Sequence, residues 1–293
     1  MDLIRRAILY HVLSGHAFFS GGVAMIVAVG LSARSERLGM RIARNLLAAS
    51  GGVLMLASAT PLPRGLVLIL TFSAILWVAG EVTHRRISTR WRLGARGNLV
   101  LMVLVAMVVE GPYHRTPRLP GLGAPVLGII GDSLTAGNSA PGGVTWPMIL
   151  ADQQGIEVRD HSASGATVAS AARQAEAIGP QERLVLIEIG GNDLLGDTAP
   201  EAFEEDLDRL LSIVQRPGRV VLMFELPWPP GHAEYGRIQR RLARQQGVLL
   251  VPRRVLLGVL LESGATTDSI HLSPAGHRRM ARDIWKIIAP AFP

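Results

Sequence analysis

The sequence contains no cysteine, and Lys286 is the only lysine among its 30 basic residues. The absence of cysteine excludes disulfides, thiolate metal sites and cysteine nucleophiles. Acidic residues are scarce in the first 123 positions, where 4 of them stand against 14 arginines. The remaining residues hold 19 acidic and 16 basic groups, so the net charge of +7 belongs entirely to the first part. The composition therefore divides the chain into two parts.

Four apolar stretches predict an all-α transmembrane bundle of about four helices in residues 1–111. The stretches cover about 12–32, 46–62, 66–80 and 92–110. A helix needs about 20 residues to cross a bilayer, so the first two suffice, and a tight turn joins the third to the second. The fourth is long enough only if its helix begins near Trp91. A secretory signal over residues 1–34 is the alternative, but three further apolar stretches disfavour a simple cleaved signal.

The arginines between these stretches predict the orientation in the membrane, because cytoplasmic loops are rich in arginine and lysine. With four spans, nine arginines fall on one side: Arg34, Arg37, Arg41, Arg44, Arg85, Arg86, Arg90, Arg92 and Arg96. Five fall on the other side: Arg5, Arg6, Arg64, Arg115 and Arg118. The larger set is expected in the cytoplasm, which places the second part outside it, anchored to the inner or plasma membrane. Charge between apolar runs does not resemble a nucleic-acid-binding face, so no nucleic-acid partner is expected.

The second part, residues 124–293, follows a linker at 112–123 that is rich in proline and glycine. Its short apolar runs are Val126–Ile130, Ile156–Asp160, Leu184–Ile189, Val220–Phe224 and Val248–Val251. Stretches with helical spacing lie between and after them, notably 200–214, 235–246 and 274–288. Alternating strands and helices predict a five-stranded parallel sheet with helices on both faces. Ligands of such sheets bind beyond the carboxyl ends of the strands, so motifs that follow strands are site candidates.

Two candidate motifs follow the first and second predicted strands. The stretch Gly131-Asp-Ser-Leu-Thr135 would place Ser133 at a helix N-terminus, where its backbone N–H can stabilise an oxyanion. Asp-Ser before a helix is also typical of a plain N-cap. In Ser164-Gly-Ala-Thr167, the amide of Gly165 can come close to a ligand, although a loop glycine before an N-cap threonine has the same pattern.

Two further motifs follow the third and fifth predicted strands. Gly190-Gly-Asn-Asp193 offers the side-chain amide of Asn192 as an oxyanion donor, or forms an ordinary tight turn. In Asp268-Ser-Ile-His271, the carboxylate can orient the imidazole, which would take a proton from a serine and return it to a leaving group. Either motif alone is common in loops. Together the four motifs occur in order at the rim of one predicted sheet.

These motifs resemble the SGNH, or GDSL, hydrolase family over roughly residues 124–290. The four positions for which the family is named are Ser133, Gly165, Asn192 and His271. Within the family, the chain looks most similar to the thioesterase I, lysophospholipase and arylesterase branch. The stretches that carry this similarity are Gly131–Thr135, Ile189–Asp193 and His271–His277.

The resemblance implies a three-layer α/β/α, flavodoxin-like fold and a serine nucleophile, with neither a metal nor another cofactor. Carried over by motif, Ser133 attacks, His271 is the base and Asp268 orients it. The oxyanion donors would be the backbone amides of Ser133 and Gly165 with the side chain of Asn192.

The expected function is that of a membrane-anchored serine esterase that hydrolyses an acyl ester or thioester through an acyl-enzyme. Its substrate could be a lysophospholipid, another acyl lipid or an O-acylated glycan. An acyltransferase that passes the acyl group to a sugar or lipid hydroxyl is the first alternative. The second is a membrane scaffold that carries a catalytically silent domain. Protein partners are not indicated.

Overall fold

The computed structural model describes residues 3–32, 37–83, 87–123, 125–137, 143–268 and 270–292. Of the positions discussed above, Arg34, Arg85, Arg86 and Ser269 lie outside the described residues. The chain divides into two compact units, which are taken in turn. The catalytic-site candidates belong to a unit made of Met1–Tyr10, Tyr113–Pro227 and Glu234–Pro293. The other unit contains His11–Pro112 and Trp228–Ala233.

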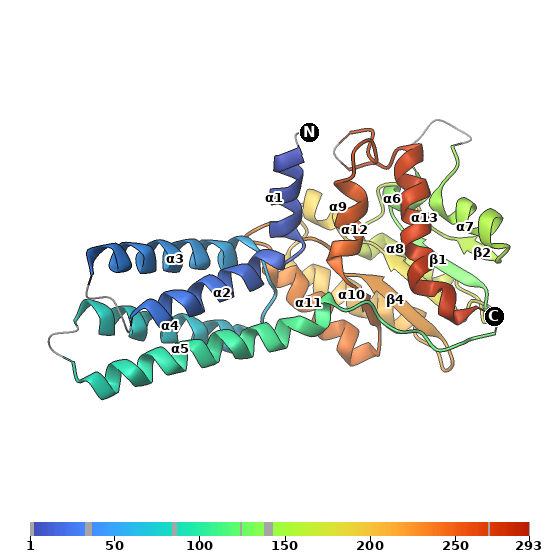
Figure 1. The fold of residues 1–293 in the computed structure, drawn as a ribbon. Coiled ribbons are helices and arrows are strands. Elements are labelled where there is room, and N and C mark those ends of the chain that lie inside the picture. The colour runs from blue at the N-terminus through green and yellow to red at the C-terminus, as the bar shows by residue number, and fades with distance from the viewer. Residues whose placement is uncertain are drawn as a thin grey trace. The chain divides into compact units, whose positions relative to one another are not determined.

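The N-terminal helices are α1 (Leu3–Leu13), α2 (His16–Leu31), α3 (Leu38–Ala57), α4 (Arg64–Val82) and α5 (Thr89–Glu110). Helix α2 packs on α3 and α5, and α4 packs on α5 (Figure 1). Glycines make the first of these contacts close, because a Cβ added at Gly21 would lie 2.6 Å from the carbonyl oxygen of Gly51. Small residues of this kind let helix backbones approach each other.

Two of the described helices are long and apolar enough to cross a membrane, namely α4 and the continuous segment Thr89–His114. The latter begins at Thr89 because Ser88 caps it, so the fourth apolar stretch is extended beyond its marginal run. The first predicted span is interrupted. Gly15, between α1 and α2, adopts a left-handed φ of 88°, and the two helices meet at an angle of 79°. Only when taken together are they long and apolar enough to span a membrane. Helix α3, as far as the structure describes it, does not meet the length and composition of a membrane span, and its sequence includes Arg41 and Arg44.

A buried ion cluster ties the helices of this unit together. Glu81 on α4 accepts Arg44 of α3 at 2.9 Å and Arg96 of α5 at 2.7 Å. Arg96 also donates to the carbonyl oxygen of Ser32, which follows α2, at 2.8 Å. Two of the nine arginines used to predict the orientation therefore have a structural partner in addition to any topological role.

The catalytic-site unit contains five strands: β1 (Leu127–Gly131), β2 (Val158–Asp160), β3 (Leu184–Glu188), β4 (Val220–Phe224) and β5 (Leu249–Val251). All neighbouring strands are parallel, in the order β2-β1-β3-β4-β5. The predicted five-stranded parallel sheet is thus confirmed. Every residue of β1 and β3 is buried, which explains why both sequences are apolar except for Glu188 at the end of β3.

Helices cover both faces of this sheet (Figure 1). They are α6 (Ser133–Ala136), α7 (Trp146–Gln154), α8 (Val168–Glu176), α9 (Gly191–Leu195), α10 (Pro200–Val214), α11 (Ala233–Gln246), α12 (Arg253–Leu260) and α13 (Pro274–Ile288), with 3₁₀ turns at Gly111–His114 and Ala289–Ala291. Helix α7 packs on α13, and α8 packs on α10. The chain moves outward from β1 to β2 and then back past β1 to β3. Because these two right-handed crossovers run in opposite directions, α7 and α8 lie on opposite faces of the sheet. The two connections therefore diverge beyond the carboxyl ends of β1 and β3.

Candidate active site

Ser133 is the first residue of α6 and lies directly beyond β1. Asp132 caps this helix, since its side chain accepts the backbone N–H of Leu134 at 2.9 Å. The N-cap interpretation therefore holds for Asp132 and leaves Ser133 one position further on, half-buried at the helix start. Backbone N–H groups of a first helical turn have no acceptor within their helix, so the Ser133 amide suits an oxyanion.

The turn that leads to Ser133 has no room for a side chain at position 131. A Cβ at Gly131 would lie 2.5 Å from Oγ1 and 2.6 Å from Cβ of Thr135. The side chain of Gln174, on α8, fixes the glycine at both of its polar groups. Its Oε1 accepts the Gly131 N–H at 3.0 Å, and its Nε2 donates to the Gly131 carbonyl at 3.1 Å.

Asn192 links the turns that follow β1, β2 and β3. Its Nδ2 donates to the carbonyl oxygen of Ala166 at 2.9 Å and lies 3.4 Å from Oδ2 of Asp132. Gly165, next to Ala166, is exposed with a φ of 74°, and a Cβ added there would meet nothing within 4 Å. A ligand atom can therefore approach the backbone at this point. The structure brings the Ser133, Gly165 and Asn192 motifs to one edge of the sheet.

Asp268 orients His271 within a single loop. Oδ2 of Asp268 lies 2.7 Å from Nδ1 of His271, and Oδ1 accepts the backbone N–H of both Ile270 and His271 at 2.8 Å. These hydrogen bonds, the one with His271 first, lower the pKa of Asp268. An acceptor at Nδ1 favours the tautomer in which Nε2 is the basic nitrogen, which is the arrangement of a histidine base.

Two buried carboxyl groups lie behind the Ser133 turn. Asp132 is 3% exposed and Glu188, the last residue of β3, is 1% exposed. Burial raises the pKa of both groups, and the charge of Asp132 adds to burial in raising the pKa of Glu188 well above its usual range. The charge of His271 lowers the pKa of Asp132, which places the imidazole in electrostatic reach of the residue before Ser133.

A third buried carboxyl group, Asp193, follows Asn192. Its Oδ2 accepts the backbone N–H of Val168 at 2.9 Å and so joins α9 to the start of α8. Burial raises the pKa of Asp193. Motif reasoning missed the parts played by Glu188 and Gln174. The signal for Glu188 is its charge at the end of the run Leu184–Glu188, whereas nothing in the local sequence singles out Gln174.

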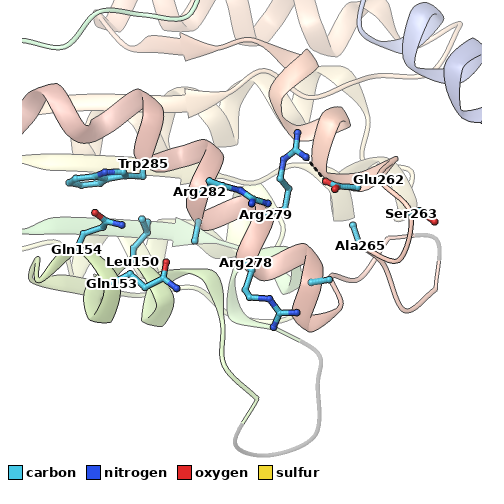
Figure 2. A pocket seen from close by; sticks show the side chains of 12 residues that line it. Leu150, Gln153, Gln154, Glu262, Ser263, Ala265, Arg278, Arg279, Arg282 and Trp285 are labelled. Carbon is cyan, nitrogen blue, oxygen red and sulfur yellow. Dashed lines mark hydrogen bonds and ion pairs between the residues drawn. The ribbon is translucent and has the colours of Figure 1, made fainter.

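A cavity of about 370 Å³ lies on the flank of the unit between α7, α13 and the loop after α12 (Figure 2). Arg279 is held there by Glu262 at 2.6 Å, and Arg278 and Arg282 also line the wall. None of the candidate catalytic residues lines it. A second cavity, of about 620 Å³, reaches Asp268 and is lined by Arg5, Arg6 and Leu9 with residues of the 260–268 segment.

Comparison with known proteins gives matches to the C-terminal part of the chain. The model of the GDSL-like Lipase/Acylhydrolase family matches residues 129–279. An arylesterase of Vibrio mimicus is 31% identical over 158 residues, which are 50% of this chain and 79% of the relative. Esterase TesA of Pseudomonas aeruginosa is 28% identical over 180 residues, 57% of this chain and 89% of the relative.

Among solved structures, esterase EstA from Pseudoalteromonas is similar with a TM-score of 0.51. It is 21% identical, and the match covers 56% of this chain and 96% of that protein. At this identity the likeness concerns the fold alone. The family match begins at residue 129, two residues into β1, so it does not include the N-terminal helices.

Proposed function

Because the chain belongs to the GDSL-like lipase/acylhydrolase family, we propose that it is a membrane-anchored esterase with Ser133, His271 and Asp268 as its catalytic triad. That it is a serine hydrolase acting on esters follows from the family. The observation that carries the assignment of residues is the 2.7 Å contact between Asp268 and His271. Their loop leads into α13, whose His277 lies 3.8 Å from the Cβ position of Gly137 at the end of the Ser133 turn. The substrate and the membrane anchor are the further parts of the proposal.

In this mechanism, Oγ of Ser133 attacks the carbonyl carbon of the ester while its proton passes to Nε2 of His271. Asp268 stabilises the imidazolium that forms. The oxyanion accepts hydrogen bonds from the amides of Ser133 and Gly165 and from Nδ2 of Asn192. When the intermediate collapses, His271 gives the proton to the departing alcohol or thiol. Water then attacks the acyl-enzyme by the same route, releasing the acid and restoring Ser133.

Exposed apolar side chains around the site support an acyl lipid as the substrate. Over the described part of residues 113–292, the markedly exposed large apolar side chains are Val144, Met148, Leu195 and Ile270. Ile270 precedes His271, and Leu195 is three residues after Asn192. The other two flank the start of α7, where Thr145 lies 3.1 Å from the Cβ position of Gly137, near the end of the Ser133 turn. Exposed apolar groups gathered at one site are typical of apolar ligand binding.

The helical unit supports anchoring in a membrane. Two of the described helices meet the length and composition of a span, and the bent pair α1–α2 would add a third. Many apolar side chains of the unit are exposed, such as Leu56 of α3 at 82%, Leu68 of α4 at 70% and Val108 of α5 at 74%. Such surfaces suit lipid rather than water. If α3 crosses as a fourth span, the excess of arginines in the loops on one side supports an extracytoplasmic catalytic domain.

Labelling of membrane fractions with a fluorophosphonate probe tests the assignment. The wild-type chain is expected to be labelled and Ser133→Ala is not, whereas Ser263→Ala, a change on the flank of the same unit, is expected to label like the wild type. Labelling that persists in Ser133→Ala would disprove the nucleophile. Incubation with a lysophospholipid then separates hydrolysis, which releases a free fatty acid, from transfer, which yields a new ester on an added alcohol.

A further inference from the structure

Glu188 lies beside the nucleophile turn because of the register of the sheet. The parallel pairing of β1 and β3 sets Gly131 against Glu188, so the two residues before Ser133 run alongside the end of β3. Oγ1 of Thr135 donates to Oε2 of Glu188 at 3.0 Å. Both side chains are fully enclosed, with Thr135 at 0% and Glu188 at 1% exposure. Glu188 is thus held against the turn without being open to substrate.

The second carboxyl oxygen of Glu188 faces another carboxyl group. Its Oε1 is buried and meets no N–H or hydroxyl donor among the described residues. The neighbouring carboxyl group is that of Asp132, whose backbone N–H also lies near the Glu188 side chain. Two neighbouring carboxyl groups can hydrogen-bond to each other only when a proton lies between them. The side chain of Asp132 also accepts hydrogen bonds from the Leu134 amide at 2.9 Å and from Nδ2 of Asn192 at 3.4 Å.

We propose that Glu188 is a positioning residue that donates its carboxylic proton to Asp132 and so holds the Ser133 turn and Asn192 in their catalytic arrangement. This inference rests on the proposed function, since it assigns a role within the same site. Glu188 touches neither the substrate nor the reacting atoms. It acts through Asp132, which caps the helix of the nucleophile with one oxygen and contacts the oxyanion amide with the other.

The charges around the pair favour a single shared proton. Glu188 faces Asp132, and Asp132 is in turn influenced by the negative charge of Asp193 and the positive charge of His271. Asp206 adds a further negative charge near Asp193. Two carboxylates in one buried site repel each other, so one of them retains its proton. Glu188 is the more deeply buried and forms no ion pair with a described residue, whereas Asp132 has an amide donor and the imidazole nearby, so Asp132 carries the charge.

Ionisation of Glu188 would place two negative charges against each other behind the turn. The Asp132 carboxylate would then move away from the Leu134 amide and toward Asn192. There it would bind the side-chain amide of Asn192, which would no longer be available to the oxyanion. The expected result is a lower kcat with little change in KM, because the apolar rim that would hold the acyl group is untouched.

Two substitutions at position 188 separate the hydrogen bond from the charge. Glu188→Gln keeps an N–H donor for Asp132 and an acceptor for Thr135, and imitates the protonated acid at every pH. Glu188→Leu has similar volume and removes both. The matched control is Glu182→Gln, because Glu182 is equally buried at 1% exposure and lies at the opposite end of β3, bonded to His161. Full-length proteins in detergent are assayed with p-nitrophenyl butyrate from pH 6 to 10, after fluorophosphonate labelling of the wild type.

We expect Glu188→Leu to lower kcat roughly tenfold to hundredfold, the effect of leaving one buried acceptor without its donor, with KM within about twofold. Glu188→Gln should stay within about threefold of the wild type and lose the alkaline decline that ionisation of Glu188 gives the wild type. The control should keep the wild-type kcat even if it lowers stability.

Other results would overturn the inference without touching the proposed function. One such result is that the wild type is labelled and active and that Glu188→Leu has the same kcat. Another is a Glu188→Gln variant as damaged as Glu188→Leu. If Glu188→Leu does not fold, an alkaline decline that is the same in Glu188→Gln and wild type decides against the proposal. A folded wild type that is neither labelled nor active would instead refute the proposed function.

Discussion

Asp268 contacts His271 twice, through the ring nitrogen Nδ1 at 2.7 Å and through the backbone N–H at 2.8 Å. The carboxylate therefore fixes both the position of the loop and the orientation of the imidazole. The side chain of Asp268 remains 54% exposed, so solvent screens the ion pair. The pair therefore contributes more to the geometry of the site than to the stability of the fold.

Asp268→Asn should separate these two effects. The amide oxygen can still accept the backbone N–H groups, but its NH₂ group cannot accept Nδ1–H and favours the wrong tautomer. We expect kcat to fall roughly 10- to 1,000-fold, less than for a fully buried triad carboxylate, with thermal stability almost unchanged. Steady-state kinetics and a thermal unfolding curve measure the two quantities. An Asn variant as active as the wild type would remove Asp268 from the triad.

Asn192→Ala should remove one oxyanion donor and leave the nucleophile in place. We expect kcat to fall about 100- to 1,000-fold with a small change in KM, because the lost hydrogen bond forms mainly in the transition state. Gln246→Ala is a matched loss of a side-chain amide, since Gln246 bonds Asp208 and Ser212 on the surface. If both variants retain wild-type kcat, Asn192 is not a donor to the oxyanion.

Gly131→Ala should destabilise the catalytic unit through a steric clash. The new Cβ would overlap Thr135, at 2.5 Å from its Oγ1, and the enclosed turn has little room to shift. The free energy of unfolding should fall by about 1–3 kcal/mol. Gly258→Ala, inside α12 with nothing within 4 Å of the added Cβ, should be neutral or stabilising. Thermal unfolding compares the two. Equal stability of both variants would contradict the close contact with Thr135.

The raised pKa of Glu188 predicts how stability depends on pH. A carboxyl group whose pKa is higher in the folded than in the unfolded state contributes its full stability below the unfolded value, about 4.3. That contribution declines as the pH rises through the folded value, which burial and Asp132 raise. Unfolding midpoints of the wild type should therefore fall from acidic to alkaline pH more steeply than those of Glu188→Gln. Parallel curves would show that Glu188 does not hold a proton in the folded state.

Glu81→Gln should weaken the helical unit, because Arg44 and Arg96 would lose their shared carboxylate in a setting where each side chain is only 12% exposed. Loss of one partner in a buried ion pair costs about 3 kcal/mol or more. Glu157→Gln breaks a surface pair with Arg159, at 60% and 38% exposure, and should cost less than about 1 kcal/mol. Limited proteolysis of the purified protein in detergent would report both. Equal resistance of the two variants would argue against a structural role for the cluster.

The local patterns that predicted the structure well were those with a strong physical signal. Apolar runs located β1, β3, β4 and β5, whereas β2 lies in Ile156–Asp160, where charged residues interrupt the apolar ones. Glycine-bearing turns after β1, β2 and β3 carry three of the four site motifs. Helix α9 was missed because Gly191–Leu195 is short and begins with the residues of a tight turn. The break at Gly15 was missed because an apolar run does not show where a left-handed residue interrupts it. The roles of Glu188 and Gln174 depend on strand register and on packing between elements distant in sequence, which no local pattern encodes.

The order of the strands has a consequence for biosynthesis. Ser133 follows the first strand of the sheet, whereas His271 follows the last, 138 positions later in the chain. At roughly 5–20 residues per second, the ribosome adds the histidine on the order of ten seconds after the serine. In the proposed mechanism, every nascent chain that ends before residue 271 lacks its base and is inactive. If the substrate is a lipid of the membrane at which the chain is made, the enzyme thus stays inert there until the histidine has been added.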